Sequence, residues 1–295
     1  MPAIADPALL IEILQTQPAV FCGFSAVFGL LIGSFLNVVI HRLPIILERK
    51  WQQEENSFES SHESKHAYNI ATPPSHCPQC KKPIRAWQNI PILSYLLLKG
   101  RCSHCQSPIS AAYPLVELSA AVLSVVTAYR FGPSWEFIFA STITYALLCL
   151  TLIDIKHRLL PDVITLPLLW IGLLLSSQHI FTGPSEAIIG ASIGYLSLWL
   201  VFHGFRLATG KEGLGYGDFK LMAVFGAWLG WSYIPVIILI SSFLGAIFGG
   251  ITILVLRVGK NFPIPFGPFI ALSGWSCLLW GEQILSVYLN LINIL

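Results

Sequence analysis

The chain has 295 residues, of which 55% are hydrophobic and only 11% are charged, and its formal net charge is +2. A soluble domain carries about 25% charged residues. A water-soluble fold of this size could not hide so much apolar surface, so the composition excludes an ordinary soluble protein and predicts a chain that faces lipid.

The N-terminal residues 1–17 contain no Lys or Arg. Because a secretory signal peptide needs a basic start, the first apolar run is expected to be a retained membrane span. A span needs about 20 mostly apolar residues, and eight runs are candidates. The runs are 18–41, 113–131, 134–154, 163–181, 186–207, 219–231, 233–257 and 266–290. We therefore expect an all-α polytopic membrane protein with about eight transmembrane helices.

Two apolar runs are too short for a simple span. At about 1.5 Å per residue, the run 219–231 reaches roughly two-thirds of the hydrocarbon thickness. It is expected to be a half-helix or a short span buried among others. The run 89–98 is shorter still, and we interpret it as an interfacial or packed segment.

The basic residues orient the helices, because Lys and Arg collect in cytosolic loops. With the N-terminus outside and eight spans, 16 of the 17 basic residues fall on the cytosolic side, and Arg130 is the exception. This predicts three parts. The first is an N-terminal segment with the first span (1–42), the second a small cytosolic domain (43–112), and the third a transmembrane bundle (113–295).

The cytosolic domain contains two Cys-x-x-Cys pairs separated by 21 residues. Four thiolates in this arrangement suit tetrahedral zinc, and a reducing cytosol argues against two disulfides. We predict a structural zinc site at Cys77, Cys80, Cys102 and Cys105, with disulfide or redox chemistry as the alternative. Three further cysteines lie in apolar runs and are expected to be small buried hydrophobes: Cys22, Cys149 and Cys277.

The polar, acidic stretch 48–68 precedes the first Cys pair and is expected to be a solvated, flexible insert. His104 lies inside the second pair and is a weaker alternative metal ligand.

Ionisable groups in membrane spans are costly and are functional candidates by default. Asp154 ends the third span and Asp218 opens the sixth, so the topology places both at the cytosolic boundary. Two carboxylates about 3 Å apart cannot both ionise easily, so such a pair shares a proton and can activate water for attack on a peptide carbonyl. The glycines of Gly215-Tyr216-Gly217 allow the close approach that a carboxylate pair needs.

Each acid has a structural alternative. Asp218 could be an ordinary helix cap, although its position at a helix N-terminus would also favour the charged form. Asp154 could be an interfacial acid beside Lys156. Asp162 follows Pro161, and we interpret it as a helix cap. Glu117 is expected to be a buried acid that bonds to the cytosolic domain, and Asn37 to link two helices.

Other functions remain open at this point. A transporter could use Asp154 and Asp218 to relay protons or ions, although its acids would be expected near the midplane. A scaffold that docks through the cysteine domain would leave the paired acids unexplained. His41, His157 and His203 lie near boundaries, but no Gly-x-Ser-x-Gly context supports a Ser/His hydrolase.

Five motifs follow one another along nearly the whole chain. They are GSFLNVVIHRLP (33–44), the two Cys-x-x-Cys pairs, YPLVEL (113–118), DIKHRLLPD (154–162) and GYGDFKL (215–221). Together they resemble the motifs of bacterial prepilin peptidases, also called type IV leader peptidases. The last of them resembles the Gly-x-Gly-Asp signature of a class of intramembrane aspartyl proteases.

The resemblance implies a multi-pass protein of the bacterial inner membrane whose large loop and active site are cytosolic. Such enzymes remove the leader from type IV prepilins and type II secretion pseudopilins, and many then methylate the new N-terminus with S-adenosylmethionine. It implies that Asp154 and Asp218 are the catalytic pair and that the four cysteines hold zinc. Its partners are the pilin substrates and the lipid bilayer, with no nucleic acid. No Gly-x-Gly-x-x-Gly loop identifies residues that bind the methyl donor.

Overall fold

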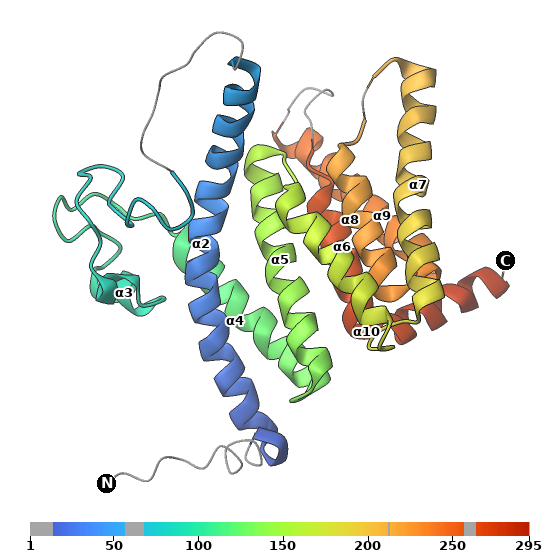
Figure 1. Cartoon of the computed structure of the whole chain (residues 1–295), viewed down its shortest axis with the longest axis horizontal. Coiled ribbons are helices and arrows are strands. Elements are labelled where there is room, and N and C mark those ends of the chain that lie inside the picture. The colour runs from blue at the N-terminus through green and yellow to red at the C-terminus, as the bar shows by residue number, and fades with distance from the viewer. Residues whose placement is uncertain (1–13, 57–67, 212, 257–263, 295) are drawn as a thin grey trace. The chain divides into compact units, whose positions relative to one another are not determined.

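The structure is a computed structural model that describes residues 14–56, 68–211, 213–256 and 264–294. Within these ranges the regular structure is helical, apart from two isolated β-bridges (Figure 1). The elements are α2 (Pro18–Asn56), η1 (Ala86–Asn89), α3 (Leu93–Leu97), α4 (Ala112–Phe131), α5 (Trp135–His157), α6 (Asp162–Ser176), α7 (Pro184–Thr209), α8 (Tyr216–Leu229), η2 (Trp231–Tyr233), α9 (Ile234–Leu256) and α10 (Gly267–Ile294).

Five helical stretches in the described part of the chain are long and apolar enough to cross a membrane. They are Pro18–Glu55, Ala112–Phe131, Trp135–His157, Pro184–Thr209 and Trp231–Thr252. The chain is therefore a multi-pass membrane protein. A helix also lies at each of the other three predicted runs, but α6 and α8 have only 15 and 14 residues, and α10 bends at Trp280.

The first helix is longer than the sequence predicted, since α2 continues to Asn56. The expectation of a flexible insert is therefore wrong for its first residues, 48–56. This part of the chain is rich in Glu, Gln, Lys and Arg, which are good helix formers. Lys50 and Glu54 also pair one turn apart at 3.9 Å. Residues 57–67 of the expected insert lie outside the described residues.

The chain divides into two compact units, 1–149 and 150–295. The division falls inside α5, and α2 runs without a break past residue 42. The sequence predicted three parts with different boundaries, 1–42, 43–112 and 113–295. That three-part division stays a prediction.

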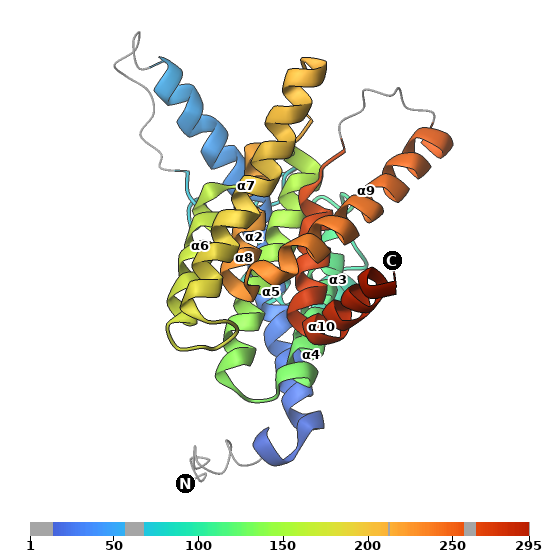
Figure 2. The same ribbon diagram turned by 90° about the vertical axis from the view of Figure 1, so that its right-hand side faces the viewer.

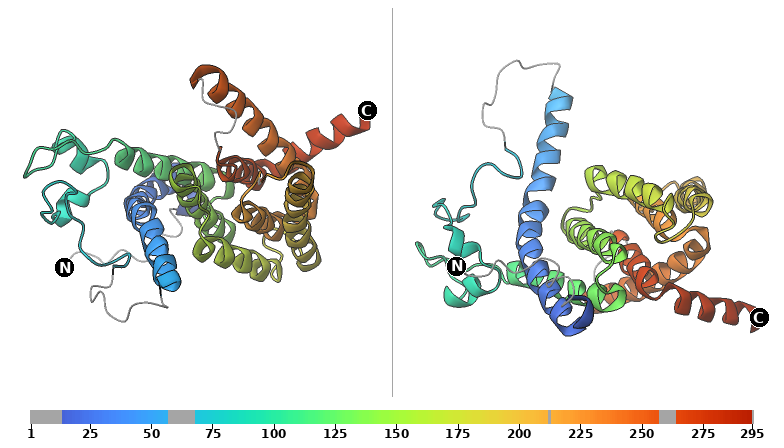
Figure 3. Two further views of the ribbon diagram at one scale, coloured as in Figure 1. Left: turned by 90° about the horizontal axis from the view of Figure 1, so that it is seen from above. Right: turned by 60° about the horizontal axis from the view of Figure 1, so that its bottom comes forward.

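In the first unit, α2 packs closely against α4 through small residues (Figure 3). A Cβ atom on Gly33 would lie 2.7 Å from the Glu117 Cα, and one on Gly29 would lie 2.8 Å from the Ala121 Cα. Asn37 donates its side-chain N–H to the Tyr113 carbonyl at 3.1 Å, as expected of a link between helices. Without these glycines the two backbones could not approach so closely.

In the second unit, the short helix α8 forms the centre and contacts α6, α7, α9 and α10 (Figure 2). Ten of its 14 residues are buried, including Phe219, Phe225 and Trp228. The Trp228 indole N–H donates to the Leu168 carbonyl of α6 at 2.8 Å. The run 219–231 is therefore a short helix that is buried among others.

Candidate active site and metal centre

Asp154 lies in the last turn of α5 and is 6% exposed. Its Oδ2 atom accepts the backbone N–H of Gly267, the first residue of α10, at 3.1 Å. A Cβ atom on Gly267 would lie 2.6 Å from that oxygen. The lack of a side chain at Gly267 therefore allows the start of α10 to reach the carboxylate. Asp154 is not the exposed interfacial acid of the alternative interpretation.

Asp218 is the third residue of α8 and is also 6% exposed. Its Oδ2 atom accepts the backbone N–H of Gly215 at 3.0 Å. Gly215, not Asp218, occupies the N-cap position, and the carboxylate reaches back to it as in a capping box. The interpretation of Asp218 as the N-cap residue is therefore wrong, although its carboxylate does help to begin the helix.

Both aspartates lie in the second unit, and a glycine beside each of them, Gly217 or Gly267, lies against the buried side chain of Leu160. A Cβ atom on Gly217 would lie 2.7 Å from the Leu160 Cβ, and one on Gly267 would lie 3.1 Å from its Cδ1. The N-terminal ends of α8 and α10 thus meet the residue that lies just before α6.

Asp162 also differs from its predicted role. Pro161 occupies the N-cap position of α6, so the cap interpretation of Asp162 is wrong. Both carboxylate oxygens of Asp162 instead accept the Lys220 ammonium of α8 at 2.7 Å. Lys220 follows Asp218 by two residues, so this ion pair ties α6 to α8 beside the aspartate site.

Glu117 is buried and accepts a hydrogen bond from the segment between α2 and α4, as expected of a buried acid that bonds to this part of the chain. The Ile92 backbone N–H donates to its Oε2 atom at 2.8 Å. This bond joins α4 to the turn between η1 and α3, within the first unit.

The two Cys-x-x-Cys pairs fold as two copies of one turn. In the first, the Cys77 N–H donates to the Lys82 carbonyl and the Ile84 N–H to the Ser75 carbonyl, at 3.0 and 2.8 Å. The second turn repeats both bonds around its own pair. The Cys102 N–H donates to the Ser107 carbonyl at 2.9 Å, and the Ile109 N–H donates to the Gly100 carbonyl at 2.8 Å. Lys81 and Gln106, one residue beyond each pair, both adopt positive φ, at 58° and 59°.

These turns bring together the four sulfur atoms of Cys77, Cys80, Cys102 and Cys105, which all lie within 4.8 Å of one another. Tetrahedral zinc with Zn–S bonds of about 2.3 Å would separate its sulfurs by about 3.8 Å. The Cys77 and Cys105 sulfurs are 3.8 Å apart, so the donors fit a metal ion. His104 is not part of this group.

The local hydrogen bonds favour the thiolate form at two of the four positions. The Cys80 backbone N–H lowers the pKa of the Cys77 thiol to about 6. The Ser107 hydroxyl lowers the pKa of Cys105. At Cys80 the Lys82 N–H acts in the same direction, but burial and the neighbouring thiols outweigh it and raise the pKa to about 11. Outside the group, Cys149 and Cys277 are buried as expected, and Cys22 is half-buried.

Two family models match the chain: "Bacterial Peptidase A24 N-terminal domain" over residues 27–131, and "Type IV leader peptidase family" over residues 141–250. A prepilin leader peptidase/N-methyltransferase of Aeromonas salmonicida is 51% identical, covering 96% of this chain and 99% of the relative. The chain belongs to the type IV leader peptidase family.

Further relatives with the same printed name support this membership. The protein of Pseudomonas aeruginosa is 49% identical and that of Stutzerimonas stutzeri is 48% identical; each match covers 95% of this chain and 98% of the relative. No solved structure matches the chain.

Two contacts near the aspartates were missed in the sequence. One is Gly267, which contacts Asp154, and the other is the ion pair of Asp162 with Lys220. One feature of the sequence could have drawn attention to Gly267, namely its position between Phe266 and Pro268 at the start of an apolar run. The ion pair had no local signal, because its two residues are 58 positions apart.

Proposed function

We propose that this chain removes the leader peptide from type IV prepilins and type II secretion pseudopilins, and then methylates the new N-terminal amine. The observation that carries the peptidase proposal is the pair of buried aspartates in one unit, each held by one backbone N–H. Because the chain belongs to the type IV leader peptidase family, we favour a peptidase over the transporter and scaffold alternatives.

The proposed proteolysis uses Asp154 and Asp218 as a pair that shares one proton. The charged member takes a proton from water while the water oxygen attacks the peptide carbonyl carbon. The protonated member donates to the leaving amine as the C–N bond breaks. One carboxylate then holds the proton taken from water, and the pair has regained its starting charge.

Proximity to a helix N-terminus does not tell which of the two aspartates is the charged member of the pair. Asp218 accepts an N–H at the start of α8, and Asp154 accepts one at the start of α10. The dipole argument made for Asp218 therefore applies to Asp154 as well.

The proposed location is the bacterial inner membrane, with eight spans, an external N-terminus, and the cysteine domain and aspartates at the cytosolic face. The distribution of Lys and Arg supports this orientation. A prepilin with a basic leader and an apolar helix would present its junction at that depth.

Zinc is the proposed metal at Cys77, Cys80, Cys102 and Cys105, where it would serve a structural role because protein ligands fill all four positions. S-adenosylmethionine would supply an electrophilic methyl group to the neutral N-terminal amine. An α-amine has a pKa of about 7.7–8.0, so a substantial part is protonated at neutral pH. The enzyme must therefore bind its neutral form. We place this reaction in the unit that contains the first span and the cysteine domain.

The purified full-length protein tests the proposal with a prepilin-like peptide and labelled S-adenosylmethionine. We expect release of the leader, followed by label on the new N-terminus of the product. Leader release without label would restrict the chain to proteolysis, and absence of release from the intact peptide would contradict the proposal.

A further inference from the structure

A short apolar segment of the cysteine domain, residues 86–98, exposes five large apolar side chains, although Pro91 within it is buried. It contains η1 and α3 with the turn between them, and no residue of α3 is buried. Leu96 and Leu97 are 65% and 69% exposed. Its other large exposed side chains are Trp87, Ile90 and Leu93. So many adjacent apolar side chains indicate a surface that is covered by something other than water.

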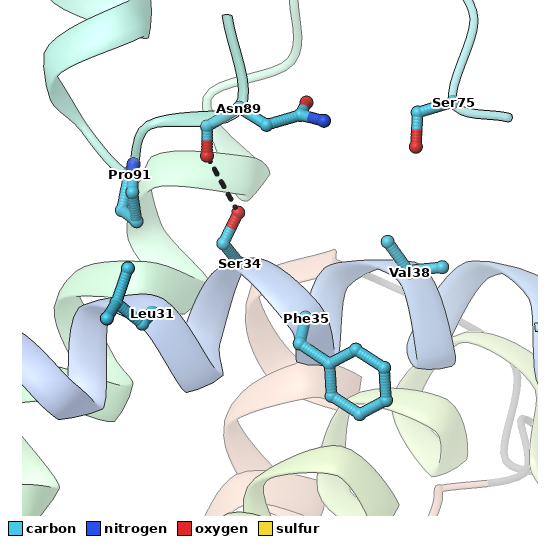
Figure 4. Close-up of a pocket in the computed structure, with 7 residues that line it drawn as sticks. All are labelled: Leu31, Ser34, Phe35, Val38, Ser75, Asn89 and Pro91. Atoms are coloured by element: carbon cyan, nitrogen blue, oxygen red, sulfur yellow. Dashed lines mark hydrogen bonds between the residues drawn. The ribbon is translucent and has the colours of Figure 1, made fainter. Parts of the chain in front are cut away.

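Two contacts hold this segment beside the membrane-spanning helices of its own unit. The Ile92 N–H donates to the Glu117 side chain of α4, and the Ser34 hydroxyl of α2 makes a longer contact of 3.4 Å with the Asn89 carbonyl (Figure 4). Around the second contact is a groove of about 300 Å³. It is lined by Leu31, Ser34, Phe35, Val38, Ser75, Asn89 and Pro91. The segment is thus tied to fixed positions along α2 and α4.

These positions give the depth of the segment. Arg42 is the first charged residue of α2, and it lies 24 residues after Pro18, or about 36 Å along the helix. This distance is slightly more than the hydrocarbon thickness of about 30 Å. Ser34 precedes Arg42 by eight residues, which is about 12 Å. Asn89 therefore lies beside the apolar part of α2 rather than beyond its charged end, and Figure 1 shows α3 level with the middle of α2.

The apolar surface of the segment continues the lipid-facing surfaces of its neighbours. On α4, Leu115 and Leu118 near Glu117 are 60% and 49% exposed, and on α2 Leu31 and Phe35 near Ser34 are 56% and 54% exposed. In a multi-pass membrane protein such side chains face acyl chains. The lipid that covers these side chains therefore also contacts residues 86–98.

The charges around the segment match a phospholipid surface. Residues 69–111 contain five basic side chains and no acidic one. Arg85 lies immediately before the segment, and Lys99 and Arg101 lie within the three residues that follow it. Basic side chains that flank an apolar interfacial segment attract anionic headgroups. The five are Lys81, Lys82, Arg85, Lys99 and Arg101.

We propose that residues 86–98 insert into the adjoining leaflet without crossing it, and that they anchor the cysteine domain to anionic phospholipid. The cysteine turns then lie against the headgroups, with Lys99 and Arg101 directed to phosphate. This inference does not depend on which reaction the aspartates catalyse.

Depth measurements on the full-length protein in nanodiscs that contain anionic phospholipid test the proposal. A spin label is placed on a genetically encoded amino acid at Leu97, and in a matched protein at Gln79, which is exposed within the first cysteine turn. We expect the label at 97 to be several-fold less accessible to a water-soluble nickel complex and more accessible to oxygen. Equal nickel accessibility at the two positions would overturn the proposal.

Two other outcomes would also overturn it. If the label at 97 were shielded from both oxygen and nickel, protein would cover the segment instead of lipid. If labels at 97 on two copies broadened each other's spectra, that protein would be a second copy of the chain.

A charge placed in the segment gives a second, independent measurement. With the label at 97, Leu96→Asp should move the label toward water, because the new carboxylate resists insertion. Gln79→Asp adds the same charge outside the segment and should leave the label at its original depth. Leu96 is exposed, so its replacement removes no core contact. An unchanged depth after Leu96→Asp would contradict the anchor.

Discussion

At the scale of single residues, two carboxylates are each held by a backbone N–H from a glycine. The Gly215 bond comes from the same chain segment as Asp218, three residues away. The Gly267 bond reaches Asp154 across 113 residues. Local sequence can therefore specify the orientation of Asp218, but the orientation of Asp154 depends on how α10 packs in the second unit.

Gly267→Ala tests this dependence. The added Cβ would lie 2.6 Å from the Asp154 Oδ2, so the carboxylate or the start of α10 must shift. A displacement of about 1 Å in a catalytic group can reduce the rate by about 100-fold. We therefore expect a reduction of leader release by about 10- to 100-fold in a peptide cleavage assay, with the protein still folded.

Gly204→Ala is the matched control, because nothing lies within 4 Å of a Cβ at that position in α7. Its cleavage rate should equal that of the wild type. If Gly267→Ala cleaved as fast as this control, the proposed role of Gly267 would be wrong.

The cysteine group makes a second prediction at this scale. Cys77→Ser removes one of four sulfur ligands and should lower the metal content of the purified protein from about one equivalent to a small fraction of it. Elemental analysis measures the zinc. Cys277→Ser, which changes a buried cysteine of α10, should retain the metal. Equal zinc in the two variants would remove the proposed site.

At the scale of the elements, α8 depends on small residues of α7 for its place in the second unit. Gly226 faces the Gly190 carbonyl, and Gly194 lies against Met222, so neither helix has room for a side chain between them. Glycines of α2, α7 and α8 thus lie at close helix contacts.

Gly226→Ala should therefore destabilise the second unit. Overpacking of a tight contact typically costs about 1–3 kcal/mol, and here the new atom would meet backbone rather than a flexible side chain. Thermal unfolding in detergent would show a lower midpoint than that of Gly204→Ala, the open position on α7. An unchanged midpoint would contradict the close packing.

The ion pair between α6 and α8 should contribute little to stability. The Lys220 and Asp162 side chains are 29% and 51% exposed, and exposed pairs are typically worth about 0.2–1 kcal/mol. We expect a double-mutant cycle of Lys220→Met and Asp162→Asn to give a coupling energy within this range, and salt to weaken it. A much larger coupling would show that the pair is effectively shielded from water.

At the scale of the whole molecule, the apolar runs located most of the helices. Each of the eight predicted runs contains a helix, because length and hydropathy are local properties of a membrane segment. The end of α2 was missed, since polar helix formers after residue 47 resemble a solvated loop when only composition is considered. The central position of α8 could be stated only as one of two alternatives, because burial depends on its neighbours.

The candidate sites were predictable to the extent that their residues form motifs. The cysteine pairs carry their own spacing, and Gly215-Tyr216-Gly217 marks Asp218. Asp154 has a weaker local signal and was identified by its depth and by resemblance. Gly267 and the Lys220–Asp162 pair were not found, because contacts between distant segments leave no spacing in the sequence.

The most direct test of the proposed function replaces each aspartate in turn. Asp154→Asn and Asp218→Asn keep the side-chain size but remove the shared proton, and loss of a general acid–base group lowers rates by about 100- to 10,000-fold. Purified wild-type and variant proteins would be compared for leader release from the same prepilin-like peptide, with Asp162→Asn as the control acid. We predict that both variants lose cleavage to this extent while Asp162→Asn stays near the wild-type rate. Cleavage at the wild-type rate by either Asp154→Asn or Asp218→Asn would contradict the catalytic pair.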